Sequence, residues 1–161
     1  MNVPQSSPTE APAMASSHPA GSLEVGSGFE LRTEPITTQQ LVRYAGASDD
    51  YNRIHYDAEF AKGAGLGGVI AHGMLTMAFM ARAATDWAGP QGRVTQIAAR
   101  FSAPVRPGDV VHVAGRITAR ERQERGVRVE CRLDADVDGR AVASGDATVM
   151  LPFADAASTT N

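Results

Sequence analysis

The chain has 161 residues, of which 43% are hydrophobic and 20% are charged, and its formal net charge is −3. This length and apolar content suit a single domain that can bury a core. A slightly acidic chain, with its arginines mixed among acids, offers no basic surface for nucleic acid. One cysteine excludes an internal disulfide framework. The sequence also lacks the run of about 18 apolar residues that a transmembrane helix needs. We therefore expect a cytoplasmic single-domain protein.

The two ends of the chain differ in composition from its middle. Residues 1–21 are rich in Ser, Pro and Ala and contain no apolar stretch of the kind that a secretory signal requires. We expect them to form a disordered leader, and residues 153–161 to form a disordered tail. The expected folded domain is residues 22–152.

The first expected elements are a strand near residues 29–33 and a short helix that follows it. Thr37 and Gln40 fit a capping box, and the apolar residues after them continue an amphipathic helix that runs toward Asp50. A second short helix is expected near residues 57–62. The end of the first helix would therefore position the acidic side chain of Asp50.

An acid, an amide and an imidazole then occur within six residues, in the stretch Asp50-Tyr51-Asn52-Arg53-Ile54-His55. A carboxylate and an imidazole that converge on one water molecule can deprotonate it and return the proton elsewhere. The alternative is that Asp50 and Asn52 only stabilise turns and that His55 is a hydrogen-bonded interior histidine. The spacing alone leaves both interpretations open.

A glycine-rich passage over residues 63–68 precedes an apolar helix that is expected from Gly73 to Trp87. The helix is apolar on nearly every side over its first two turns, which indicates a central, buried element. The N–H groups of its first turn lack intrahelical partners, and Gly73 has no side chain to block close approach. Gly73 is therefore a candidate donor to a carbonyl oxygen, although a glycine here could also simply ease entry into the helix.

The last third of the chain alternates apolar and polar residues with period two, as half-buried antiparallel strands do. The apolar positions are Val111, Val113, Ile117, Val127, Val129, Cys131, Leu133, Ala135 and Val137. Asp138-Gly139 is typical of a tight hairpin turn before a final strand. One buried helix and a run of antiparallel strands predict an α+β domain.

Two of these motifs together resemble the MaoC-type dehydratase family, which includes the (R)-specific enoyl-CoA hydratases and the mycobacterial-type 3-hydroxyacyl thioester dehydratases. They are Ser48-Asp49-Asp50-Tyr51-Asn52-Arg53-Ile54-His55 and, downstream, Ile70-Ala71-His72-Gly73-Met74-Leu75-Thr76. The resemblance extends to residues 22–26, which look like the family's opening strand, and to residues 104–109. It implies the hotdog fold, in which an antiparallel sheet wraps around a central helix.

The resemblance also implies an activity and a role for each matching residue. The activity is reversible hydration of trans-2-enoyl thioesters, or dehydration of (R)-3-hydroxyacyl thioesters, carried on CoA or on acyl carrier protein. Asp50 and His55 would hold and activate one water, Asn52 would order the loop between them, and the Gly73 N–H would receive the thioester oxygen. A homodimer, or a pair with a related hotdog subunit, would be the assembly.

Two positions depart from the family pattern. Arg53 stands where the family usually has proline, and Ala81 stands where some enoyl hydratases carry a supporting serine. In addition, Asp49 stands where many members have glycine. None of these departures removes Asp50 or His55.

No metal or cofactor is expected. The four histidines His18, His55, His72 and His112 are scattered along the chain without metal-ligand spacing. We expect His72 to have a structural role at the helix start, and Cys131 to be a buried small hydrophobe and not a nucleophile.

Two other functions compete with the hydro-lyase. A hotdog thioesterase would typically use an acid on the central helix, and here that helix has none before Asp86. A non-catalytic acyl-binding partner subunit would not need Asp50 and His55, both of which are intact. Fold alone does not decide among the three.

Overall fold

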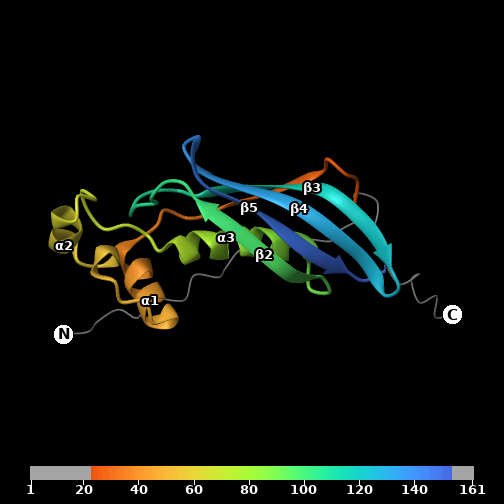
Figure 1. Ribbon diagram of the computed structural model, residues 1–161, viewed down its shortest axis with the longest axis horizontal. Helices are drawn as coiled ribbons and strands as arrows, with labels where there is room; N and C mark the ends of the chain where they lie inside the picture. The colour runs from red at the N-terminus through yellow and green to blue at the C-terminus, as the bar shows by residue number, and fades with distance from the viewer. Residues whose placement is uncertain (1–22, 154–161) are drawn as a thin grey trace, which may run out of the picture.

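Within residues 23–153, which are the residues that the computed structural model describes, five antiparallel strands form one sheet (Figure 1). The strand order is β1-β3-β4-β5-β2. The strands are β1 (Gly28–Arg32), β2 (Arg93–Phe101), β3 (His112–Gln123), β4 (Gly126–Val137) and β5 (Arg140–Leu151). The expected leader, residues 1–21, lies outside the described part, as does the expected tail from residue 154. Phe153 is described, and its ring centroid lies 4.5 Å from the Arg122 guanidinium.

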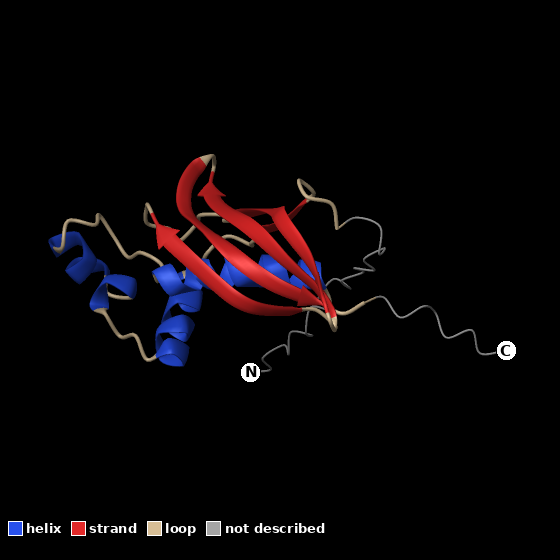
Figure 2. Ribbon diagram, turned by 45° about the vertical axis from the view of Figure 1, so that its right-hand side comes forward, coloured by secondary structure: helices blue, strands red, loops and turns tan. Residues whose placement is uncertain are grey.

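The helical elements fall into two groups. The long helix α3 (Gly73–Ala88) lies against one face of the sheet, whereas α1 (Thr38–Ser48), the 3-10 turn η1 (Arg53–His55) and α2 (Ala58–Gly63) gather beyond one end of it (Figures 1 and 2). None of the helices in the described part of the chain is both long and apolar enough to cross a membrane.

Helix α3 contacts all five strands and forms the centre of the core. Its buried positions recur every three or four residues, and they are Leu75, Thr76, Phe79, Met80, Ala83, Ala84 and Ala88. Burying each large apolar side chain contributes about 1.5–3 kcal/mol to stability. The predictions of a buried central helix and of an α+β domain are confirmed.

An aromatic contact joins the far end of α3 to the edge of the sheet. The ring of Phe29 on β1 stacks on Trp87 of α3 with 4.9 Å between centroids. The same ring covers Gly115 on β3, where any Cβ would overlap it. A residue without a side chain is therefore needed at Gly115 for β1 to bring Phe29 onto the helix.

The period-two pattern correctly identified the buried face of β3 and β4. Val113, Ile117, Val129, Cys131 and Leu133 are each 1% exposed or less. The predicted hairpin is also confirmed, because Asp138 (φ 50°) and Gly139 (φ 80°) form the two-residue loop between paired Val137 and Arg140. Two successive positive φ angles are the geometry that Asp-Gly favours.

Strand β2 was missed, and residues 22–26, which the resemblance suggested as an opening strand, do not correspond to a strand in the described residues. In β2 the alternation of half-buried and exposed residues is interrupted by a register shift between Val94 and Gln96, so period two does not run through it. Residues 23–27 are not a strand, because Gly26 (φ 97°) turns the chain and the Ser27 N–H donates to the Glu24 carbonyl. The first strand starts at Gly28, close to the expectation of residues 29–33.

We predict that Cys131 is inert to alkylation in the folded protein. The thiol is 1% exposed, and burial raises its pKa to about 11. At pH 8 only about one thiol in a thousand would be the reactive thiolate, even if the reagent could reach it. Intact mass after iodoacetamide treatment should show no adduct without denaturant and one adduct in denaturant. Rapid labelling of the native protein would contradict this placement.

Candidate active site

The end of α1 directs Asp50 into the site. Asp49 adopts a left-handed conformation (φ 55°, ψ 26°), and the Asp50 N–H donates to the Ala45 carbonyl oxygen at 3.2 Å. A left-handed residue at a helix C-terminus favours glycine and tolerates Asp or Asn, which accounts for an aspartate at this position. The expected helix that leads to Asp50 is confirmed.

Side-chain hydrogen bonds fold the loop from Asp50 to His55 back on itself. The Asn52 N–H donates to Asp50 Oδ1 at 3.2 Å, and Asn52 Oδ1 accepts from the Ile54 N–H at 3.3 Å at the start of η1. This folding of the loop places Asp50 Oδ2 3.9 Å from His55 Nε2. The structure thus places the expected acid and imidazole side by side, with Asn52 between them in the chain.

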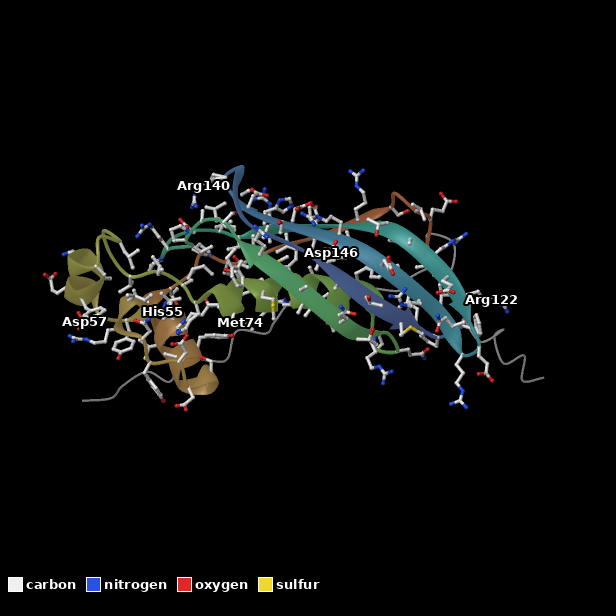
Figure 3. All side chains as sticks on the ribbon, in the orientation of Figure 1. His55, Asp57, Met74, Arg122, Arg140 and Asp146 are labelled. Atoms are coloured by element: carbon white, nitrogen blue, oxygen red, sulfur yellow. The ribbon has the colours of Figure 1, made fainter. Side chains whose placement is uncertain are left out.

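His55 is held in one orientation by the backbone. Its ring is 7% exposed, and Nδ1–H donates to the Ile70 carbonyl oxygen at 2.8 Å, while the Ile70 N–H donates to the Ile54 carbonyl at 3.1 Å. Because a carbonyl oxygen can only accept, the neutral ring carries its proton on Nδ1. The lone pair of Nε2 is left to face Asp50. Figure 3 shows His55 beside the end of α3 that carries Met74.

The gap between the two groups suits a shared water molecule. A distance of 3.9 Å is too long for a direct hydrogen bond. One water could bond to both atoms, and the Asp50 side chain is 51% exposed, so solvent can reach it. An acceptor nitrogen and a carboxylate on one water are the elements of general acid/base chemistry.

His72 lies directly before α3, at the helix start where it was expected, but its contacts with Asp50 and His55 were not predicted. It is 1% exposed, its Nε2 lies 3.2 Å from the Asp50 carbonyl oxygen, and its ring stacks on that of His55 with 3.7 Å between centroids. Burial lowers the pKa of His72, and the nearby His55 acts in the same direction. The one available signal was its position directly before Gly73, at the start of the apolar helix.

Gly73 begins α3, as predicted, and borders an apolar cavity of about 330 Å³. Its N–H, in the first turn, has no intrahelical partner. A Cβ at this position would lie 3.1 Å from the Phe101 ring. The cavity is lined by Leu66, Ile70, Ala71, Gly73, Thr76, Phe101, Ala103, Pro104, Val105 and Val142. Gly73 and Ile70 therefore connect the cavity to the pair of His55 and Asp50.

An ion pair bridges the loop where the family usually has proline. Arg53 Nη2 lies 2.6 Å from Asp57 Oδ2, and its guanidinium covers the Phe60 ring at 4.7 Å from the centroid. Asp57 Oδ1 in turn accepts from the Phe60 N–H at the start of α2, and this backbone hydrogen bond, followed by Arg53, lowers the Asp57 pKa. Arg53 thus connects η1 to α2 by side-chain contacts. At the other departure, Ala81 is partly buried on α3.

The expectation that the histidines are scattered is wrong for His55 and His72. One ligand-type atom from each of them and from Asp50 lies within 4.8 Å of the others, the spacing of a group that could hold a metal ion. Each ring hydrogen-bonds to a backbone carbonyl oxygen through one of its two nitrogens, as histidines do both with and without a bound metal. The arrangement can carry out proton transfer with these side chains alone.

The sequence of this chain is similar to those of known hydratases and dehydratases. A family model described as MaoC like domain matches residues 22–138. The (R)-specific enoyl-CoA hydratase of Rhodospirillum rubrum is 32% identical over 118 residues, which are 73% of this chain and 81% of that protein. The 3-hydroxybutyryl-CoA dehydratase of Methylorubrum extorquens is 32% identical over 131 residues, which are 81% of this chain and 82% of that protein.

A solved structure extends the similarity to three dimensions. The R-hydratase PhaJ1 of Pseudomonas aeruginosa is 32% identical, with a TM-score of 0.72, over 80% of this chain and 82% of that one. The expected hotdog fold and the family resemblance are both confirmed. The chain belongs to the MaoC-like family of hydratases and dehydratases.

Proposed function

We propose that this protein is a hydro-lyase that reversibly adds water to trans-2-enoyl thioesters and removes it from (R)-3-hydroxyacyl thioesters, with Asp50 and His55 as its acid/base pair. The observation that carries the proposal is the distance of 3.9 Å between Asp50 Oδ2 and His55 Nε2. Nε2 can accept a proton, because the ring proton is on Nδ1, which donates to the Ile70 carbonyl oxygen. The same activity is named for the two relatives at 32% identity.

The chemistry needs one water molecule and no redox partner. The pair withdraws a proton from the bound water, whose oxygen forms a bond to C3 of the enoyl group while the C2–C3 double bond shifts its electrons toward the carbonyl. The pair then returns a proton to C2 of the resulting enolate, and the product is the 3-hydroxyacyl thioester. Dehydration passes through the same states in the opposite order.

The Gly73 N–H is the proposed donor to the thioester oxygen. Negative charge builds on that oxygen as the enolate forms, and an N–H at a helix start is fixed in place and carries partial positive charge. Removing one such donor costs about 3–4 kcal/mol in other enzymes. The cavity beside Gly73 is lined almost wholly by apolar side chains and suits an acyl group.

The geometry does not favour a thioesterase. The first acid on α3 is Asp86, thirteen residues beyond Gly73, which corresponds to roughly 20 Å along a helix. Asp86 is also engaged by Arg82 at 3.2 Å. No α3 carboxylate therefore lies near the proposed carbonyl site.

We further propose that residues 22–152 act as one catalytic domain that pairs with a second hotdog subunit, either an identical copy or a related chain. Apolar side chains are exposed around the site, with Tyr51 59%, Met74 52% and Phe101 44% exposed. Strand β2, which ends at Phe101, pairs within the described sheet only with β5, so its outer edge is unpaired. A cytoplasmic location belongs to the same proposal, since the chain's single cysteine forms no internal disulfide.

The direct test uses a panel of trans-2-enoyl-CoA substrates of rising chain length. Hydration removes the absorbance of the conjugated enoyl thioester without releasing free thiol, which is followed in parallel. Thiol release at the rate of absorbance loss would instead identify a thioesterase. No change with any CoA or carrier-protein substrate would support the non-catalytic alternative.

Asp50→Asn and His55→Ala should each lower kcat at least about 100-fold, because each removes a proton-handling group. Circular dichroism should show that both variants keep the fold. Asp49→Asn is a matched control for the first, since Asn tolerates the left-handed conformation, and His112→Ala on the sheet is a control for the second. Near-wild-type rates in both test variants would refute the assignment.

Gly73→Ala should lower kcat/KM at least about tenfold while changing the free energy of unfolding by less than about 1 kcal/mol. The alanine keeps the N–H but adds a methyl group 3.1 Å from the Phe101 ring, where the substrate carbonyl would approach. Gly63→Ala is the control, because a Cβ there meets no atom within 4 Å. Unchanged kinetics in Gly73→Ala would remove Gly73 from the site.

A further inference from the structure

We propose that His72 is a positioning residue for this reaction, and that it holds the Asp50 backbone in place by donating its Nε2–H to the Asp50 carbonyl oxygen. The inference rests on the proposed function of Asp50 and His55. It assigns a role to a buried polar side chain that the proposed mechanism does not itself use.

The first observation is the hydrogen bond between His72 and the loop. Nε2 lies 3.2 Å from the Asp50 carbonyl oxygen, and the ring is 1% exposed. A carbonyl oxygen only accepts, so Nε2 must carry a proton. Asp50 otherwise lies on a surface loop with a half-exposed side chain, and the buried donor His72, directly before α3, fixes its main chain from the inner side.

The second observation is the packing of the ring between groups of the site. His72 stacks on His55 with 3.7 Å between centroids and an interplanar angle of 22°, and Tyr44 of α1 lies 5.0 Å away at 55°. The ring has little freedom to turn, so the direction of its Nε2–H is fixed. His72 therefore contacts α1, the Asp50 loop and η1 from the first residue before α3.

The third observation is the unpaired nitrogen. His72 Nδ1 is buried without a hydrogen-bond partner in the described part of the chain. A second proton there would be an unsatisfied buried donor, and its charge would lie against His55. The groups that face the ring are the Asp50 carboxylate, the His55 imidazole and the Tyr44 side chain, and burial is the largest influence that lowers the pKa of His72. His72 is thus neutral near pH 7, with its proton on Nε2.

This arrangement links the three proposed parts of the active site. His72 donates to the residue that carries the carboxylate, stacks on the imidazole and directly precedes the Gly73 N–H. A neutral ring in this place also allows His55 to take up a proton during turnover without a second cation beside it. Displacement of catalytic groups by about 1 Å can cost roughly 100-fold in rate, so loss of this anchor should be visible in kcat.

Two variants separate the hydrogen bond from the ring. His72→Phe keeps a stacking ring and loses the donor, whereas His72→Gln loses the ring but can extend an amide N–H to the same carbonyl. We expect His72→Phe to lower kcat roughly 10- to 100-fold with KM within about threefold of wild type, and His72→Gln to stay within about threefold in both. Thermal unfolding of both variants checks that the fold persists.

The two kinetic outcomes that overturn the proposal are distinct. Wild-type kcat in His72→Phe would show that the hydrogen bond does not matter, and a greater loss in His72→Gln than in His72→Phe would show that His72 acts through its stacked ring and not through the hydrogen bond. If both variants had a lower thermal stability, a lower kcat and a higher KM, His72 would likewise have a purely structural role.

A spectroscopic measurement judges the proposal without any substrate. Long-range proton–nitrogen correlation spectra of ring-labelled wild-type protein should show His72 neutral and protonated on Nε2 from pH 7 to 8. A proton on Nδ1, or a charged ring in this range, would overturn the inference. Because this readout needs no turnover, it remains decisive even if wild-type protein hydrates no enoyl thioester and the proposed function itself fails.

Discussion

The burial of α3 against the sheet is the constraint on which the rest of the structure depends. All five strands contact this helix, and its apolar side chains make up the centre of the core. A helix fixed along its length also has a fixed N-terminus, so the backbone at His72 and Gly73 cannot move without disturbing the core. The central helix of the fold thus positions the Gly73 N–H and the buried His72 imidazole, the two groups to which we assign roles at this end of the site.

The other half of the site is a surface loop, and local hydrogen bonds compensate for its exposure. Asp50 and Asn52 bond to nearby backbone N–H groups, and Arg53 pairs with Asp57 across the loop. These contacts are individually modest, because exposed ion pairs contribute about 0–1 kcal/mol. The bonds from His55 to Ile70 and from His72 to Asp50 are partly buried, and they attach the loop to the core. The contacts of His55 and His72 with the core therefore determine the distance between the Asp50 carboxylate and the His55 imidazole.

Sequence reasoning recovered the elements that carry strong local signals. The apolar run after Gly73, the Thr37 cap, the Asp138-Gly139 turn and the alternation in β3 and β4 were all read correctly, because each depends on neighbours in the chain. Strand β2 was missed because a register shift breaks its alternation. The proximity of His55 and His72 was missed because it arises from the packing of a loop against a helix start seventeen residues away, which no local pattern encodes.

Arg53, where the family resemblance led us to expect proline, shows the same division. The sequence identified Arg53 as a departure that leaves Asp50 and His55 in register, yet gave no sign that its guanidinium would pair with Asp57 and cover Phe60. These two side-chain contacts connect η1 to α2 across the turn. The family motif predicted which residues meet, and only the three-dimensional structure shows what holds them there.

The central claim is that Asp50 and His55 act as one unit on a single water molecule, and a double-mutant cycle on kcat/KM for a trans-2-enoyl-CoA tests it most directly. If they share one water, the variant that combines Asp50→Asn with His55→Ala should be about as slow as the slower single variant, because either change alone already disables the unit. Losses that multiply in full would show two independent roles and contradict the account.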